Sequence, residues 1–218
     1  MTGVQTCALP IYSPVYRAWN AAADLVIVNA LTLLACLPVL TAGAALSACA
    51  RVTMEMARDE ETYIVRSWWR AWRSALGQSL LWWPLVLALA ALGLWEYLLL
   101  ADAGGGALSG LVLAGGVVLL GVVVWLVPLT AFFSAPLGRH IANAARLAVG
   151  ALGLTGLCLL VVLAPLALVW FLPGVWTGLI WFMVLIGVGF QAYLIALIQR
   201  RVIDRLRQSK FVDRKSVV

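Results

Sequence analysis

The sequence contains very little charge. Of its 218 residues, 11% are charged and 64% are hydrophobic, and there is a single histidine. Soluble domains carry about 25% charged and about 45–50% apolar residues. A chain with a mean hydropathy of +1.03 cannot cover a water-facing surface with polar groups. The composition therefore excludes a soluble globular domain, a disordered tail and a nucleic-acid-binding protein.

The sequence also lacks the short motifs that accompany common catalytic and cofactor sites. It has no HExxH, GxSxG or Walker pattern, and no GxGxxG in the context of a nucleotide-binding turn. Cys36, Cys49 and Cys158 lie apart from one another in apolar segments and form no CxxC pair. Isolated cysteines of this kind act as small hydrophobic residues. We therefore predict that the protein is not an enzyme and holds no metal or cofactor.

The two ends of the chain differ from the rest. Residues 2–11 (TGVQTCALPI) and 213–218 (DRKSVV) back-translate to DNA that resembles sequencing adapters. We interpret residues 1–12 and 213–218 as artefacts of an assembled DNA fragment, and 13–212 as a single multi-pass membrane domain. The alternative is a native polar N-terminus.

Four long apolar segments predict membrane-spanning helices. They cover residues 80–101, 108–133, 148–172 and 175–199, and Glu96 is the only charged residue among them. Each is longer than the about 20 residues that cross a hydrocarbon core of about 30 Å.

Two shorter segments lie in the first third of the chain. Residues 21–40 are apolar and contain Pro38, with a glycine soon after the segment, and both residue types break helices. Residues 43–58 then have a helical pattern but contain Arg51 and Glu55, whose i, i+4 spacing lets their charges partly neutralise each other. We interpret 21–40 as span one and 43–58 as a short, tilted span two. The alternative is a single span followed by a re-entrant or interfacial helix.

The placement of arginine predicts the orientation of these spans. The connection after residue 56, the connection after residue 133 and the C-terminal tail contain arginines, whereas residues 102–107 and 173–174 contain none. Basic loops stay in the cytoplasm, so we predict a cytoplasmic C-terminus and, with six spans, a cytoplasmic N-terminus in a bacterial inner membrane. The predicted fold class is all-α: a polytopic membrane helix bundle of about six transmembrane helices, with basic amphipathic interfacial helices on the cytoplasmic side.

Two cytoplasmic connections have an amphipathic pattern, at residues 60–78 and 137–147. Tryptophan rings sit well at headgroup level, and arginines reach anionic phosphates. We expect these helices to contact the anionic headgroups of the bilayer through Arg66, Trp68, Trp69, Arg70, Trp72, Arg73, Arg139 and Arg146.

Polar residues inside the predicted spans are the candidates for function, because an ionisable group is costly in a membrane. The candidates are Asp24, Asn29, Arg51, Glu55, Glu96 and Gln191. The structural alternatives are a helix-dipole position for Asp24, a structural ion pair for Arg51 with Glu55, and an outer-edge position for Glu96. Glycines also recur at helix-packing spacings, as Gly106 with Gly110 and at Gly150, Gly153 and Gly156. We expect these glycines to pack helices inside one chain.

The first third carries a recognisable set of residues. It has Ser13–Arg17 (SPVYR), Asn29, Leu37-Pro38 followed by Thr41, and an Arg58-Asp59-Glu60-Glu61 run leading to Tyr63, Arg66 and Ser67. These features, and the ending Gln191–Leu206, resemble the YesL-like family of bacterial integral membrane proteins, domain of unknown function 624. The resemblance implies a multi-pass inner-membrane protein, often associated with carbohydrate-uptake and sensor genes. It implies no activity and no catalytic residues.

Two functional hypotheses follow. The first is a non-enzymatic accessory or interaction component, with transporter subunits of a carbohydrate-uptake system as possible partners. The second is a small solute-binding or transport protein that uses Asp24, Asn29, Glu96 or Gln191 around a central cavity.

Overall fold

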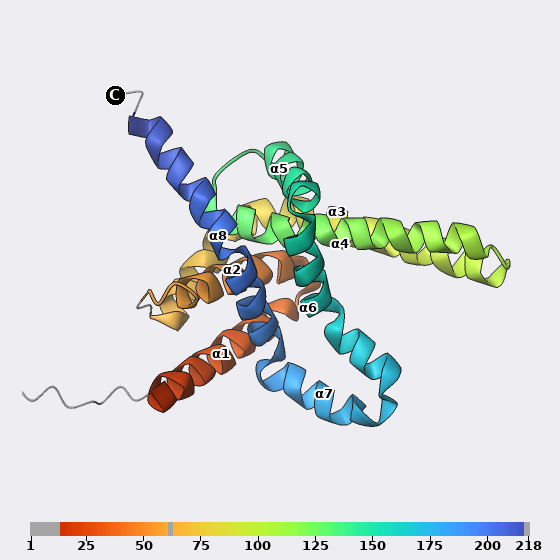
Figure 1. The fold of residues 1–218 in the computed structure, drawn as a ribbon, viewed down its shortest axis with the longest axis horizontal. Coiled ribbons are helices and arrows are strands. Elements are labelled where there is room, and N and C mark those ends of the chain that lie inside the picture. Colours follow the sequence, from red (N-terminus) through yellow and green to blue (C-terminus); the bar gives the residue numbers. More distant parts are fainter. Residues whose placement is uncertain (1–13, 61–62, 216–218) are drawn as a thin grey trace, which may run out of the picture.

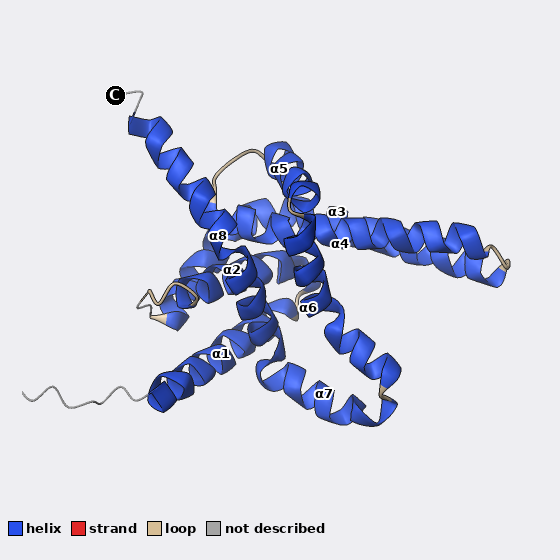
Figure 2. Ribbon diagram, viewed as in Figure 1, coloured by secondary structure: helices blue, strands red, loops and turns tan. Residues whose placement is uncertain are grey.

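The computed structural model describes residues 14–60 and 63–215 and builds them almost entirely from helices joined by short turns (Figure 2). No strand occurs in this part of the chain, so the predicted all-α fold is confirmed. Residues 1–12, predicted to be an artefact, lie outside the described residues, as do residues 216–218. The helices are α1 (Pro14–Cys36), α2 (Ala42–Met56), α3 (Ile64–Asp102), α4 (Gly106–Phe132), α5 (Leu137–Gly150), α6 (Leu152–Phe171), α7 (Trp176–Phe182) and α8 (Val188–Lys215).

Helix α3 joins a predicted interfacial segment and a predicted span into one element. It contains 39 residues, which corresponds to about 58 Å at about 1.5 Å per residue. Pro84 lies inside it without ending it. A helix of this length is about twice as long as a hydrocarbon core is thick, so its two halves meet different surroundings.

Helix α2 is short and lies among other helices. It has 15 residues, and ten of them are buried, most with small side chains. Small side chains allow close approach, and α2 contacts α1, α3, α4 and α8. At Gly43 the approach to α3 is close, because an added Cβ would lie 2.7 Å from Cβ of Trp83.

Five helical segments of the described chain are long and apolar enough to cross a membrane, and α2 is not one of them. At about 1.5 Å per residue, its length of about 22 Å falls short of a hydrocarbon core of about 30 Å. The sixth span, predicted at residues 43–58, therefore stays a prediction, as does the re-entrant alternative.

Helices α3 and α4 form a hairpin that extends away from the other helices (Figure 1). The turn passes through Gly104, whose φ of 71° favours glycine. We call residues 84–120 the hairpin arm. Ser109 is the one buried residue of the arm, and its leucines and valines are widely exposed. The residues that the structure describes therefore leave this apolar hairpin uncovered.

The prediction that five spaced glycines pack helices against each other inside the chain is wrong. A Cβ added at Gly106 or Gly110 would meet no atom within 4 Å, and the same holds for Gly150, Gly153 and Gly156. The first two lie in the hairpin arm, and the other three lie at the end of α5 or at the start of α6. No other described helix packs against any of the five positions. Their spacing therefore says nothing about packing within one molecule.

The predicted fifth and sixth spans are both interrupted. Helix α5 ends at Gly150. Ala151 leaves the helical conformation, and α6 begins at the next residue. The predicted span at 175–199 consists of α7, a π-turn at Met183–Gly187 and the start of α8. Helix α8 then continues well past residue 199, so its final turn includes residues 213–215, which were predicted to be an artefact.

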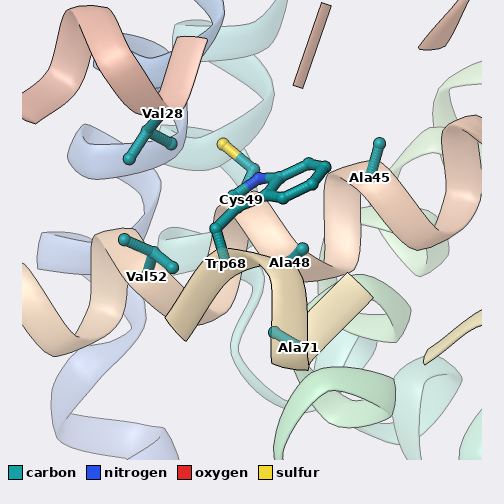
Figure 3. Close-up of a cluster of buried hydrophobic side chains, with 7 residues drawn as sticks. All are labelled: Val28, Ala45, Ala48, Cys49, Val52, Trp68 and Ala71. Carbon is teal, nitrogen blue, oxygen red and sulfur yellow. The ribbon is translucent and has the colours of Figure 1, made fainter. Parts of the chain in front are cut away.

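The main buried cluster surrounds the indole of Trp68, where α1, α2 and α3 meet. Figure 3 shows this side chain of α3 among residues of all three helices. Trp68 Nε1 donates a hydrogen bond to Thr32 Oγ1 of α1 at 3.2 Å. A second cluster around Trp82 and Trp125 joins α3, α4 and α5, and Trp125 Nε1 donates to Thr155 Oγ1 at 2.9 Å. Two buried indoles with paired N–H groups, those of Trp68 and Trp125, thus stabilise the centre of the fold.

Candidate functional site

Asn29 of α1 is bonded to irregular backbone near the start of α8. Its Nδ2 donates to the carbonyl oxygen of Val184 at 2.8 Å and to that of Met183 at 3.3 Å, and its Oδ1 accepts from the Gly189 N–H at 3.0 Å. A π-turn disturbs the regular helical hydrogen bonds, so its backbone groups need other partners. The side chain is completely buried. Asn29 therefore joins α1 to the start of α8 and has no free group for a solute.

Gln191 has a similar role on the other side of α8. Its Nε2 donates to the carbonyl oxygen of Val161 in α6 at 2.9 Å. This bond joins α8 to α6. Two of the polar residues proposed to surround a solute cavity therefore make bonds between helices.

Arg51 and Glu55 form the ion pair that their spacing predicts. Arg51 Nε lies 3.3 Å from Glu55 Oε1. Glu55 also accepts from Ser67 Oγ of α3 at 2.7 Å, and Arg51 Nη1 donates to the carbonyl oxygen of Ala131 at 3.3 Å. These bonds connect α2 with the start of α3 and the end of α4. The pair therefore links three helices, as the structural alternative expected.

Asp24 and Glu96 do not join the other candidates. Asp24 is half-buried in α1, and Glu96 is exposed on the hairpin arm. The structure thus spreads the six sequence candidates over α1, α2, α3 and α8 and does not gather them around one cavity. A shallow groove lies on α6 instead, lined by Leu160, Leu163, Ala164, Ala167, Leu168 and Phe171.

Most of the predicted interface residues are available to a membrane surface. Arg66, Trp69, Arg70 and Arg73 of α3 are exposed, as are Arg139 and Arg146 of α5. Arg73 lies over the ring of Trp69, with its guanidinium carbon 4.9 Å from the ring centroid. Trp69 also stacks on Trp72, which is half-buried, with ring centroids 5.0 Å apart.

The expectation for Trp68 is wrong. This residue is only 2% exposed and lies in the main buried cluster. Trp68 shares an apolar face with Trp69 and Trp72 in the sequence pattern, but α1 and α2 cover its part of that face. The pattern identifies an apolar face and does not say whether protein or lipid covers it.

A charged cluster surrounds Phe132, the last residue of α4, and the sequence patterns did not predict it. Arg58 Nη2 lies 2.5 Å from Asp204 Oδ1 of α8, and Arg200 Nη1 donates to the carbonyl oxygen of Ala57 at 3.2 Å. The participants are far apart in the chain, and no spacing rule connects them. An arginine directly after α2 and an acidic residue in a basic tail were the available signals.

One third of the chain, from the middle of α1 to near the end of α3, carries a family match. Residues 25–97 match the model of a family described as protein of unknown function, DUF624. The match agrees with the family that the sequence patterns predict for this part of the chain. The DUF624 region contains α2, the second half of α1 and most of α3, and hence Asn29, the Arg51–Glu55 pair and the Trp68 cluster. No curated protein and no solved structure matches the chain significantly.

Proposed function

We propose that this DUF624 protein is a non-enzymatic accessory component of a bacterial inner membrane. In this proposal it attaches to subunits of a membrane transporter, and the family resemblance suggests a carbohydrate-uptake system. The basic helices that start α3 and form α5 would then lie at the cytoplasmic headgroups, with both termini in the cytoplasm.

The observation that carries the proposal is the uncovered hairpin arm. The arm extends past the other helices (Figure 1), and its leucines and valines are largely exposed, with no partner among the residues that the structure describes. The face that contains Gly106 and Gly110 has no neighbouring atoms at the Cβ positions. Small residues on an exposed membrane helix allow the backbone of another helix to come close. The arm can therefore reach a helix of a neighbouring subunit without rearranging the rest of the fold.

The solute-binding alternative has less support. Asn29, Gln191 and Glu55 are already hydrogen-bonded within the protein. The groove on α6 has an aliphatic and aromatic lining. A solute with several hydroxyl groups needs convergent polar partners, and the residues proposed for that role lie on separate helices.

Co-purification from native membranes tests the proposal. We would extract tagged protein with a mild detergent and quantify transporter subunits per mole of it by mass spectrometry. Gly110→Leu fills the open glycine face of the arm and should lower recovery of the partner several-fold. Gly153→Leu is the matched control, because its Cβ position is equally open but lies on α6; it should leave recovery unchanged. Wild-type protein that is monodisperse and partner-free, or equal loss in both variants, would contradict the proposal.

A further inference from the structure

Three guanidinium groups surround one aromatic ring near the end of α4. The guanidinium carbons of Arg51, Arg58 and Arg207 lie 5.8, 5.3 and 5.4 Å from the ring centroid of Phe132. They come from α2, from the turn after α2 and from α8. Together with Arg200, which donates to the carbonyl oxygen of Ala57 at the same end of α2, we call them the arginine cluster.

The carboxylates near the arginine cluster do not balance its charge. Glu55 pairs with Arg51 and Asp204 pairs with Arg58. Glu60 lies 4.0 Å from Arg58 and is half-exposed. Four arginines thus face three carboxylates, one of them at the limit of an ion pair. Among the side chains that the structure describes, Arg200 and Arg207 have no carboxylate within 4.0 Å, and Arg207 is the exposed one of the two.

Part of the cluster has a structural explanation. Arg51 and Arg200 donate to carbonyl oxygens near the C-terminal ends of α4 and α2, where helices need donors. This explanation does not extend to Arg207, whose described contact is the ring of Phe132. Nor does it fully satisfy Arg58: Nη2 pairs with Asp204, but the buried Nε and Nη1 have no hydrogen-bond acceptor among the described residues. The cluster is therefore short of acceptor oxygens as well as of negative charge.

We propose that the arginine cluster binds a phosphate group. Arg51 is 39% exposed along its side chain and Arg207 is exposed, so these two would donate to the phosphate oxygens, while Arg58 adds positive charge from the buried side. Guanidinium groups match phosphate oxygens in pairs. The cluster borders the basic tail, on the side predicted to be cytoplasmic, where phospholipid headgroups lie. The phosphate could belong to an anionic phospholipid or to a small phosphorylated compound.

Binding to the detergent-purified full chain tests the proposal. We would titrate it with fluorescent short-chain phosphatidylglycerol, with the zwitterionic phosphatidylcholine analogue as a comparison, and add inorganic phosphate as a competitor. Wild-type protein should prefer phosphatidylglycerol. Arg207→Gln should weaken this binding about tenfold, since it removes one charge-assisted contact. Competition by millimolar inorganic phosphate would identify a free-phosphate site, and binding that resists it would identify a lipid site.

Arg205→Gln is the matched control. It makes the same charge change two residues away on α8, also at an exposed position, and should leave binding unchanged. Phe132→Leu keeps every charge and removes the ring, so it should also weaken binding. Equal loss in Arg205→Gln and Arg207→Gln would overturn the proposal, because the effect would then be a general one of charge. Wild-type protein with no preference for phosphatidylglycerol and no response to inorganic phosphate would overturn it without any variant.

Discussion

Both halves of α3 carry many apolar residues, but only the first half is buried by the other helices. In the first half Trp68, Ala71, Ala75, Ser79 and Trp82 are buried against α1, α2, α4 and α5. From residue 84 to the end of the helix no residue is buried. Trp68 is 2% exposed, whereas Trp95 is 63% exposed. Apolar character therefore does not tell which residues the chain covers with its own helices and which it leaves to the membrane or to a partner.

The largest difference between the halves should appear when a tryptophan is removed. Trp68→Ala should lower the free energy of unfolding by about 3–5 kcal/mol, because it leaves a cavity in the main buried cluster. Trp95→Ala in the hairpin arm should change it by less than about 0.5 kcal/mol. Unfolding by titration from a mild detergent into sodium dodecyl sulfate measures both. Similar losses in the two variants would show that the arm is covered as well.

A smaller effect is expected where α2 approaches the first half of α3. Gly43→Ala places a methyl group 2.7 Å from Cβ of Trp83. The indole of Trp83 donates to the carbonyl oxygen of Val39 at 2.7 Å, which restrains its movement. Overpacking of this kind costs about 1–3 kcal/mol. Gly93→Ala is the control in the arm, where nothing lies within 4 Å, and alanine there should be neutral or slightly stabilising. A neutral Gly43→Ala would show that α2 and α3 are farther apart than described.

The smallest effect concerns a polar contact between the same two helices. Ser67→Ala removes the hydrogen bond to Glu55 and should cost about 1 kcal/mol. Ser74→Ala removes only a bond to the carbonyl oxygen of Ala71 within α3, so its cost should be lower. The same detergent titration measures the two. A larger loss in Ser74→Ala than in Ser67→Ala would contradict the account of Glu55 as a link between helices.

The sequence predicts the features that depend on neighbouring residues. The ion pair of Arg51 with Glu55 follows from their spacing within one helix, and the apolar runs identify the long helices. The family match was also predictable from short local patterns. These features need only the geometry of a single helix.

The remaining features depend on contacts between distant segments. Asn29 bonds backbone groups 154 to 160 residues away, and no periodicity points to them. The burial of Trp68 depends on Thr32 and on the small residues of α2, which leave space for the indole. The arginine cluster forms because α2, α4 and α8 meet at Phe132. In each case the deciding fact is which helices lie next to each other.

Spin-label accessibility along α3 tests the central claim most directly. Genetically encoded spin-labelled residues would be placed one at a time at Ala71, Ala75, Leu89, Leu92 and Leu99, with the protein in lipid nanodiscs and its native cysteines unchanged. Collision rates with oxygen should be low at the first two positions and high at the three arm positions, because oxygen concentrates in lipid. Equally low oxygen collision rates in both halves, or high collision rates with a water-soluble nickel reagent at Leu89 and Leu92, would contradict the account.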